Sequence, residues 1–200
     1  MISRRALLAA VTARERCDFL RLDLQTNEVL TEDWHGSVDE SIDPGSLWKP
    51  IAAMQLRGAS PFFECRGCWA GRRHGRIDVV DAIGYSCNEW FRQWGVRGEV
   101  PNSAIGYALS FAELLRRRAE HPAVIAGLRM AAALGTASAL GGRYLAKTGT
   151  GPSKKHAGDG WVIAAWPADS PQQLALLRAP GVTGAQAAKL LRERVERERW

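Results

Sequence analysis

Residues 143–178 read RYLAKTGTGPSKKHAGDGWVIAAWPADSPQQLALLR, and this stretch decides the fold. Three runs within it, at 143–149, 161–166 and 174–178, are rich in apolar and aromatic residues, and loops with glycine, proline and serine separate them. Such runs between turn residues are typical of consecutive β-strands. The stretch therefore predicts three strands, with KTGT (147–150) at the end of the first.

A strand pair is predicted near the start of the chain, from FLRLDL (19–24) and EVLT (28–31) around a turn. A chain that opens with a hairpin and closes with three strands builds one antiparallel sheet from both of its ends. The residues between them, about 43–140, have mostly helical patterns. The predicted fold class is therefore α+β: an antiparallel sheet flanked by helices, with an inserted helical block, in a single domain over residues 17–200.

Helical signals place five helices in and after that block. The predicted helices span 46–55, 77–84, 122–134 and 183–199, and a fifth begins at Ser110, where Glu113 completes a capping box.

Composition narrows the class of protein. With 46% hydrophobic and 24% charged residues in 200, the chain can build a core, and no run of about 18 apolar residues predicts a membrane-spanning helix. The net charge is +6, but only Arg116, Arg117 and Arg118 form a basic run, and basic and aromatic residues do not alternate as in nucleic-acid binders. We expect no nucleic-acid partner. Residues 1–16, with Arg4-Arg5 before an apolar stretch, predict either an export segment or a first amphipathic helix.

Three short motifs lie at the junctions between the predicted helices and the sheet. Ser46 and Lys49 are three residues apart at a helix start, so their side chains share one face, and a partly desolvated lysine can act as base for a serine. The SCN sequence at 86–88 follows the end of a predicted helix and can aim the Ser86 hydroxyl and the Asn88 amide into a cleft. Each motif alone is common by chance.

The third motif, KTGT (147–150), offers a lysine and two hydroxyls at a strand end. Gly149 carries no side chain, so an extended substrate can approach the strand closely. These groups suit a substrate that bears a carboxylate. As a set, the three motifs occur in the order found in penicillin-binding proteins and serine β-lactamases.

The sequence resembles the transpeptidase domain of penicillin-binding proteins. The resemblance covers about residues 18–190 and rests on four segments: PGSLWKP (44–50), HGRID with SCN (74–78 and 86–88), AKTGT (146–150) and GWV (160–162). It implies an acyl-serine enzyme without a cofactor, which acts on the D-alanyl-D-alanine peptides of peptidoglycan as a transpeptidase or D,D-carboxypeptidase and is inhibited by β-lactams. It also implies an extracytoplasmic location and partners from cell-wall synthesis.

The resemblance assigns a role to each motif residue. Ser46 is the residue acylated and Lys49 its base, while Ser86 relays protons. Asn88 holds the substrate. The remaining assignments place Lys147, Thr148 and Thr150 on the terminal carboxylate of the substrate, and the backbone N–H groups of Ser46 and Thr150 in the oxyanion hole.

Two rival functions share these motifs. A serine β-lactamase needs a base that activates the deacylating water, and no glutamate-containing segment identifies itself as that base. A sensor of β-lactams or wall peptides would keep the fold and acylate without turnover.

The four cysteines leave their chemistry open. Cys65, Cys68, His74 and Cys87 can be viewed as zinc ligands, but no second close pair accompanies the CRGC sequence, so no metal is expected. In the exported enzyme that the resemblance implies, a disulfide from Cys65 or Cys68 to Cys87 is expected, with free buried thiols as the alternative.

Overall fold

The computed structural model describes residues 17–56, 61–94, 100–153 and 156–198. The predicted export segment or first helix, residues 1–16, lies outside the described residues. None of the helices in this described part combines the length and apolar character that crossing a bilayer requires.

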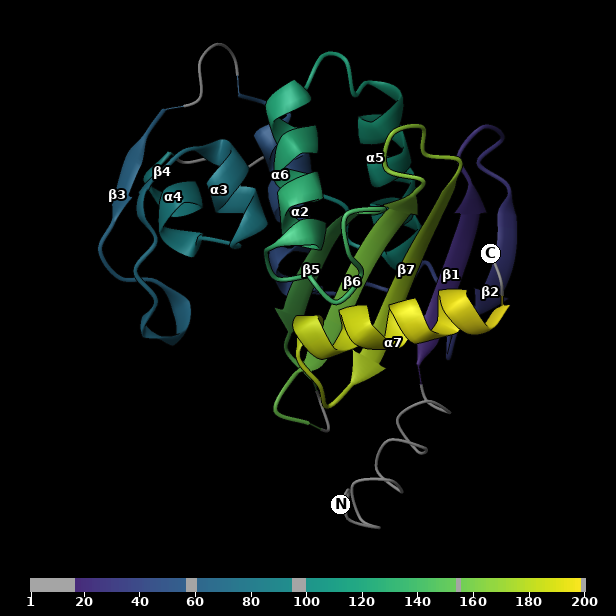
Figure 1. The fold of residues 1–200 in the computed structure, drawn as a ribbon. Helices are drawn as coiled ribbons and strands as arrows, with labels where there is room; N and C mark the ends of the chain where they lie inside the picture. Colours follow the sequence, from purple (N-terminus) through teal and green to yellow (C-terminus); the bar gives the residue numbers. More distant parts are fainter. Residues whose placement is uncertain (1–16, 57–60, 95–99, 154–155, 199–200) are drawn as a thin grey trace.

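A five-stranded antiparallel sheet, in the order β2-β1-β7-β6-β5, forms the centre of the molecule (Figure 1). Its strands are β1 (Asp18–Asp23), β2 (Val29–Asp33), β5 (Leu145–Gly151), β6 (Asp159–Trp166) and β7 (Gln173–Pro180). Leu20 of β1 lies opposite Leu176 of β7, so the first and last strands are neighbours. The α+β class, with one sheet built from both ends of the chain, is confirmed.

Most of the helices belong to the block between β2 and β5. That block contains the 3₁₀ turn η1 (Gly45–Leu47), α2 (Trp48–Ala53), the 3₁₀ turn η2 (Trp69–Gly71), α3 (Val79–Gly84), α4 (Asn88–Gln93), α5 (Ala104–Arg116) and α6 (Pro122–Ala133). The closing helix α7 (Gly184–Glu198) follows the last strand. The helices predicted at 46–55, 122–134 and 183–199 are confirmed within two residues at each end.

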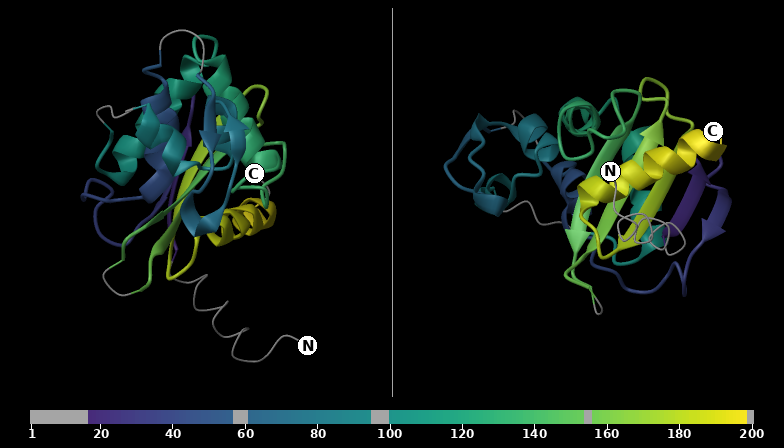
Figure 2. Two further views of the ribbon diagram at one scale, coloured as in Figure 1. Left: turned by 90° about the vertical axis from the view of Figure 1, so that its left-hand side faces the viewer. Right: turned by 60° about the horizontal axis from the view of Figure 1, so that its bottom comes forward.

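The two faces of the sheet pack against different helices, because side chains alternate along each strand. Ala146 and Val162 pack with α7, whereas Leu145 and Ile163 belong to the core shared with the helical block. Figures 1 and 2 show α7 lying across one face of the sheet and α5 behind the other. The direction of each β5 side chain thus decides which core it enters.

Two predicted helix starts are wrong. Helix α5 begins at Ala104 because the Ser103 side chain accepts a hydrogen bond from the Gly106 N–H (3.2 Å), so Ser110 lies inside the helix. Helix α3 begins at Val79, where the Asp78 carboxylate caps two backbone N–H groups.

A small second sheet was not predicted. Ile77, assigned above to a helix, instead ends β4 (Gly75–Ile77), which pairs with β3 (Phe63–Cys65). This hairpin lies with α3 and α4 to one side of the main sheet, on the left in Figure 1.

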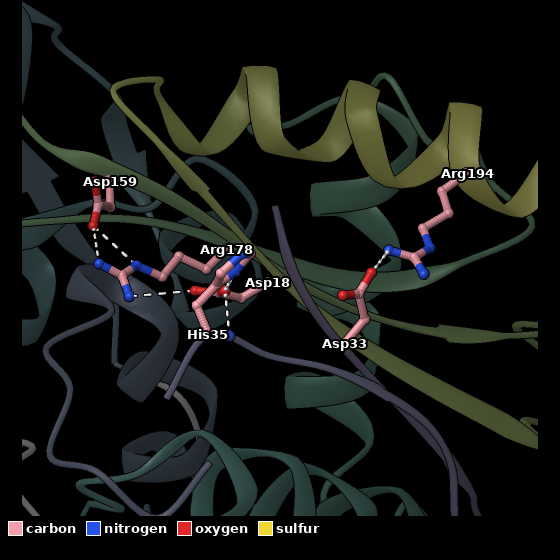
Figure 3. Close-up of polar contacts among 6 residues, drawn as sticks. All are labelled: Asp18, Asp33, His35, Asp159, Arg178 and Arg194. Carbon is pink, nitrogen blue, oxygen red and sulfur yellow. Dashed lines mark hydrogen bonds and ion pairs between the residues drawn. The ribbon is translucent and has the colours of Figure 1, made fainter. Parts of the chain in front are cut away.

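Buried carboxylates at one end of the main sheet share a single arginine (Figure 3). Arg178 on β7 donates to Asp159 on β6 (2.6 Å) and to Asp18 on β1 (3.3 Å), and both carboxylates are at most 2% exposed. His35 also contacts Asp18 (2.7 Å). Because an unpaired buried charge is costly, Arg178 holds three neighbouring strands in register at this end.

We expect Arg178→Met to lower the free energy of unfolding by about 2 to 4 kcal/mol, since two buried carboxylates then lose their main cationic partner. Arg117→Ala, which breaks an exposed ion pair with Glu120, is the matched control and should cost less than about 0.5 kcal/mol. Urea unfolding of both variants measures the difference. Equal losses would show that the buried arrangement contributes no more than a surface pair.

Candidate functional site

The segment that carries Ser46 lies against the end of β5. A Cβ built on Gly149 would come within 3.0 Å of the Pro44 carbonyl oxygen, and one on Gly151 within 3.0 Å of the Asp43 carbonyl oxygen. Gly45, with φ +57°, makes the reciprocal close approach to Thr150. Glycines on both partners therefore let the two backbones touch, and this contact fixes Ser46 beside the KTGT strand.

Lys49 follows Ser46 by three residues. Ser46 is in η1, whereas Lys49 is in the first turn of α2. The Lys49 side chain is 1% exposed. Within the described part of the chain, its Nζ atom makes no hydrogen bond to Ser46; it bonds instead to the SCN loop.

The SCN sequence follows the end of α3, as the sequence predicts, and leads into α4, a helix that was not predicted and that begins at Asn88. Lys49 Nζ donates to the Ser86 carbonyl oxygen (2.8 Å), the Ser86 hydroxyl (3.2 Å) and Asn88 Oδ1 (2.5 Å). Ser86 has φ +59°, a left-handed conformation that is uncommon for residues other than glycine. Trp69 supports it by donating from Nε1 to the Ser86 carbonyl (3.0 Å). The sequence analysis missed this role of Trp69, which no motif marks.

Lys147 reaches the same hydroxyl from the sheet. Its Nζ atom donates to Ser86 Oγ (3.0 Å) and to the Thr148 carbonyl oxygen (2.7 Å), and its side chain is fully buried. Lys147 lies opposite Ile163, so it enters the core on the side of the helical block. The structure thus brings Lys49, Ser86, Asn88 and Lys147 together around one hydroxyl group.

Burial lowers the pKa of both lysines below that of a lysine in water. Burial lowers the pKa of Lys49 to about 8, although Cys68 and Cys87 oppose the shift. The pKa of Lys147 is held well below its usual value, first by complete burial and then by the charge of Lys49. Within the described chain, neither ammonium has a carboxylate at ion-pair distance. Both shifts increase the fraction of neutral amine, the form that can accept a proton, relative to a solvated lysine.

The two threonines of the KTGT motif face away from Lys147. Thr148 donates from Oγ1 to Thr136 Oγ1 (2.6 Å), and Thr150 Oγ1 accepts a hydrogen bond from the Gly184 N–H at the start of α7 (3.1 Å). Thr148 is buried, whereas Thr150 is exposed. The carboxylate-binding role of these hydroxyls stays a prediction, and of the two only Thr150 is open to solvent.

A cleft of about 690 Å³ lies next to the segment before Ser46 and the loop that follows β5. Asp43, three residues before Ser46, and Pro152, directly after β5, are among its lining residues, and the cleft extends to Arg178 at the end of the sheet. None of the motif residues lines it.

The predicted disulfide is not formed. Cys65, Cys68 and Cys87 are free thiols, and the Cys65 and Cys87 sulfur atoms are 3.6 Å apart, whereas a disulfide joins its sulfurs at about 2 Å.

No protein-family model matches the chain, and no curated protein matches it in sequence. Solved structures do match. The D,D-transpeptidase domain of a peptidoglycan glycosyltransferase from Eggerthella lenta is similar with a TM-score of 0.77 at 14% identity, over 96% of this chain and 81% of that one. Penicillin-binding protein 2 (PBP2) from Helicobacter pylori, in complex with MreC, gives 0.73 at 14% identity over 97% and 63%.

The transpeptidase domain of the D,D-transpeptidase FtsI4 from Legionella pneumophila gives a TM-score of 0.66 at 18% identity, over 94% of this chain and 92% of that one. The chain therefore has the fold of a penicillin-binding protein transpeptidase domain. Its three motifs lie on η1 and α2, on the loop between α3 and α4, and on the edge strand β5 of that fold.

We expect Gly149→Ala to lower the free energy of unfolding by roughly 1 to 3 kcal/mol, because the new methyl group meets the Pro44 backbone, which cannot swing aside as a side chain could. Gly142→Ala is the control, since a Cβ there has no atom within 4 Å. Thermal unfolding compares the two. If both variants match the wild type, the close contact between η1 and β5 does not exist in solution.

Proposed function

We propose that the chain is an acyl-serine enzyme of the penicillin-binding type, which acts on D-alanyl-D-alanine peptides of peptidoglycan as a transpeptidase or D,D-carboxypeptidase. The observation that carries the proposal is the convergence of two buried lysines on the Ser86 hydroxyl, beside a serine that glycine contacts hold against β5. Burying two amines without carboxylate partners costs free energy, and a purely structural core does not need it. A role in proton transfer would explain why the two amines are buried together.

In the proposed acylation, neutral Lys49 takes the Ser46 hydroxyl proton as the Ser46 oxygen attacks the substrate carbonyl carbon. The tetrahedral intermediate then collapses, its C–N bond breaks, and the proton passes to the leaving nitrogen through Lys49 and Ser86. Water or an amine later attacks the acyl carbonyl carbon, the C–O bond to Ser46 breaks, and the proton lost by the attacking group returns to the Ser46 oxygen through Lys49. The backbone N–H groups of Ser46 and Thr150, on the two touching segments, are the proposed oxyanion hole.

We propose that the charge of the substrate favours a protonated Lys147 and a neutral Lys49. A terminal carboxylate near the end of β5 would favour the ammonium form of Lys147, and the charge of Lys147 would in turn disfavour protonation of Lys49. Because Lys147 is fully buried, we assign direct contact with the carboxylate to exposed Thr150, and we assign to Lys147 the positive potential. Asn88, exposed at the start of α4, would hold the substrate amide.

Absence of a second base favours a lasting acyl-enzyme over β-lactamase activity. Among the described residues, no aspartate or glutamate side chain is hydrogen-bonded to Ser46, Lys49, Ser86 or Lys147. We place the enzyme outside the cytoplasm, with cell-wall synthesis proteins as partners. One structural neighbour, PBP2 of H. pylori, is found in complex with MreC.

A fluorescent penicillin with intact-mass measurement over time tests the proposal. We expect a lasting adduct on the wild type and on Ser170→Ala, an exposed control on the loop between β6 and β7, and none on Ser46→Ala. Ser46→Ala should keep its stability, because the Ser46 side chain caps no helix.

An adduct that vanishes within minutes would instead identify a β-lactamase. No adduct on a folded wild type would overturn the acyl-serine assignment, and labelling that persists in Ser46→Ala would overturn the choice of nucleophile.

A further inference from the structure

Four side chains that can bind a transition metal meet beside the SCN loop. They are Cys65, Cys68, His74 and Cys87, and their ligand atoms all lie within 4.8 Å of one another. We propose that they form a structural Zn²⁺ site. The sequence contains only one close pair of ligands, Cys65 and Cys68, which predicted no metal, but the fold brings the distant Cys87 to that pair.

Distances within the cluster fit one small ion. The Cys65 and Cys87 sulfur atoms are 3.6 Å apart, and Cys65 Sγ is 3.3 Å from His74 Nδ1. In a tetrahedral site with Zn–S bonds near 2.3 Å and Zn–N bonds near 2.0 Å, ligand atoms are separated by about 3.5 to 3.8 Å. Three sulfurs and one imidazole are a common ligand set for structural zinc, whereas magnesium and calcium prefer oxygen.

Zinc binding would also set the charge of the cluster, because thiols bind the ion as thiolates. Zn²⁺ would displace the three thiol protons to solvent and leave a complex of charge −1.

The segment that carries three of the ligands has an excess of positive charge. Residues 64–77 contain four arginines, Arg66, Arg72, Arg73 and Arg76, and a single acidic residue, Glu64. The His74 ring is also held in one plane, since it stacks on Tyr85 at 5.8 Å and 9°. A charged complex placed here has nearby counter-charges and a fixed imidazole.

The small sheet is too short to gain much stability from its own strand pairing. β3 and β4 have three residues each, and a two-stranded hairpin alone is marginally stable in water. Cys65 ends β3, His74 directly precedes β4, and Cys87 lies between α3 and α4. One ion bound by all three would tie the hairpin to the two helices.

The zinc site would also fix the position of the SCN loop (86–88). Cys87 separates Ser86 from Asn88, and both of these accept hydrogen bonds from Lys49. The Asn88 N–H in turn donates to Cys68 Sγ (3.2 Å), which is a ligand on the opposite side of the cluster. By binding the neighbouring Cys87, zinc would therefore stabilise the left-handed conformation of Ser86 without contacting the substrate.

The test is the zinc content of the full chain, purified without added metal or reductant and measured by elemental analysis. We expect about one Zn²⁺ per chain in the wild type and in the control Cys17→Ser, whose buried thiol is not one of the four ligands. Cys68→Ser and His74→Ala should bind Zn²⁺ at least about tenfold more weakly. In the wild type, Co²⁺ in place of Zn²⁺ should show the absorption of a tetrahedral, sulfur-rich complex, which a misfolded variant cannot imitate.

Two results would overturn the site: a wild type with four reactive thiols that takes up no Zn²⁺, or a disulfide between Cys87 and Cys65 or Cys68 in the purified chain. Removal of Zn²⁺ by a chelator should also slow penicillin labelling about ten- to a hundredfold. That last effect rests on the proposed function, whereas zinc content does not, so the two proposals can fail separately.

Discussion

Two lysine side chains buried without a carboxylate partner are the constraint on which this site depends. Lys49 and Lys147 enter from opposite sides, one from α2 and one from β5, and both donate to Ser86 Oγ. A serine hydroxyl can accept two hydrogen bonds and still donate its own proton. Burial lowers the pKa of both lysines, and the charge of Lys49 lowers that of Lys147 further, so each amine loses its proton more readily than a solvated lysine does.

The fold holds each lysine of this pair on a different element, Lys147 on β5 and Lys49 on α2. The sheet alternation sends Lys147 toward the helical block, and the glycine contacts between η1 and β5 set where α2 begins. On the third side, Ser86 is held by Trp69 and by the loop that contains Cys87. Each lysine therefore meets the hydroxyl through rigid elements, which is what preorganised proton transfer requires.

Local patterns predicted the fold well because most elements show clear apolar runs and turn residues. The closing strands, helix α6 and the motif positions follow from such patterns. Sequence reasoning failed where side-chain capping decides a boundary, as at Ser103 and Asp78, and where strands are too short to show alternation, as in β3 and β4. The expected pairing of Cys87 with Cys65 or Cys68 correctly brought these cysteines together, but the sulfur atoms of Cys65 and Cys87 lie 3.6 Å apart and form no disulfide.

The most direct test of the account is the second-order rate of penicillin acylation in Lys49→Arg and Lys49→Met, compared with Lys189→Arg on the exposed face of α7. Arginine keeps the charge but cannot accept a proton, and methionine fills a similar volume without a buried ammonium. We expect both Lys49 variants to fold and to acylate about 10²- to 10⁴-fold more slowly, while Lys189→Arg matches the wild type. A folded Lys49 variant that acylates at the wild-type rate would contradict the central claim that Lys49 is the base.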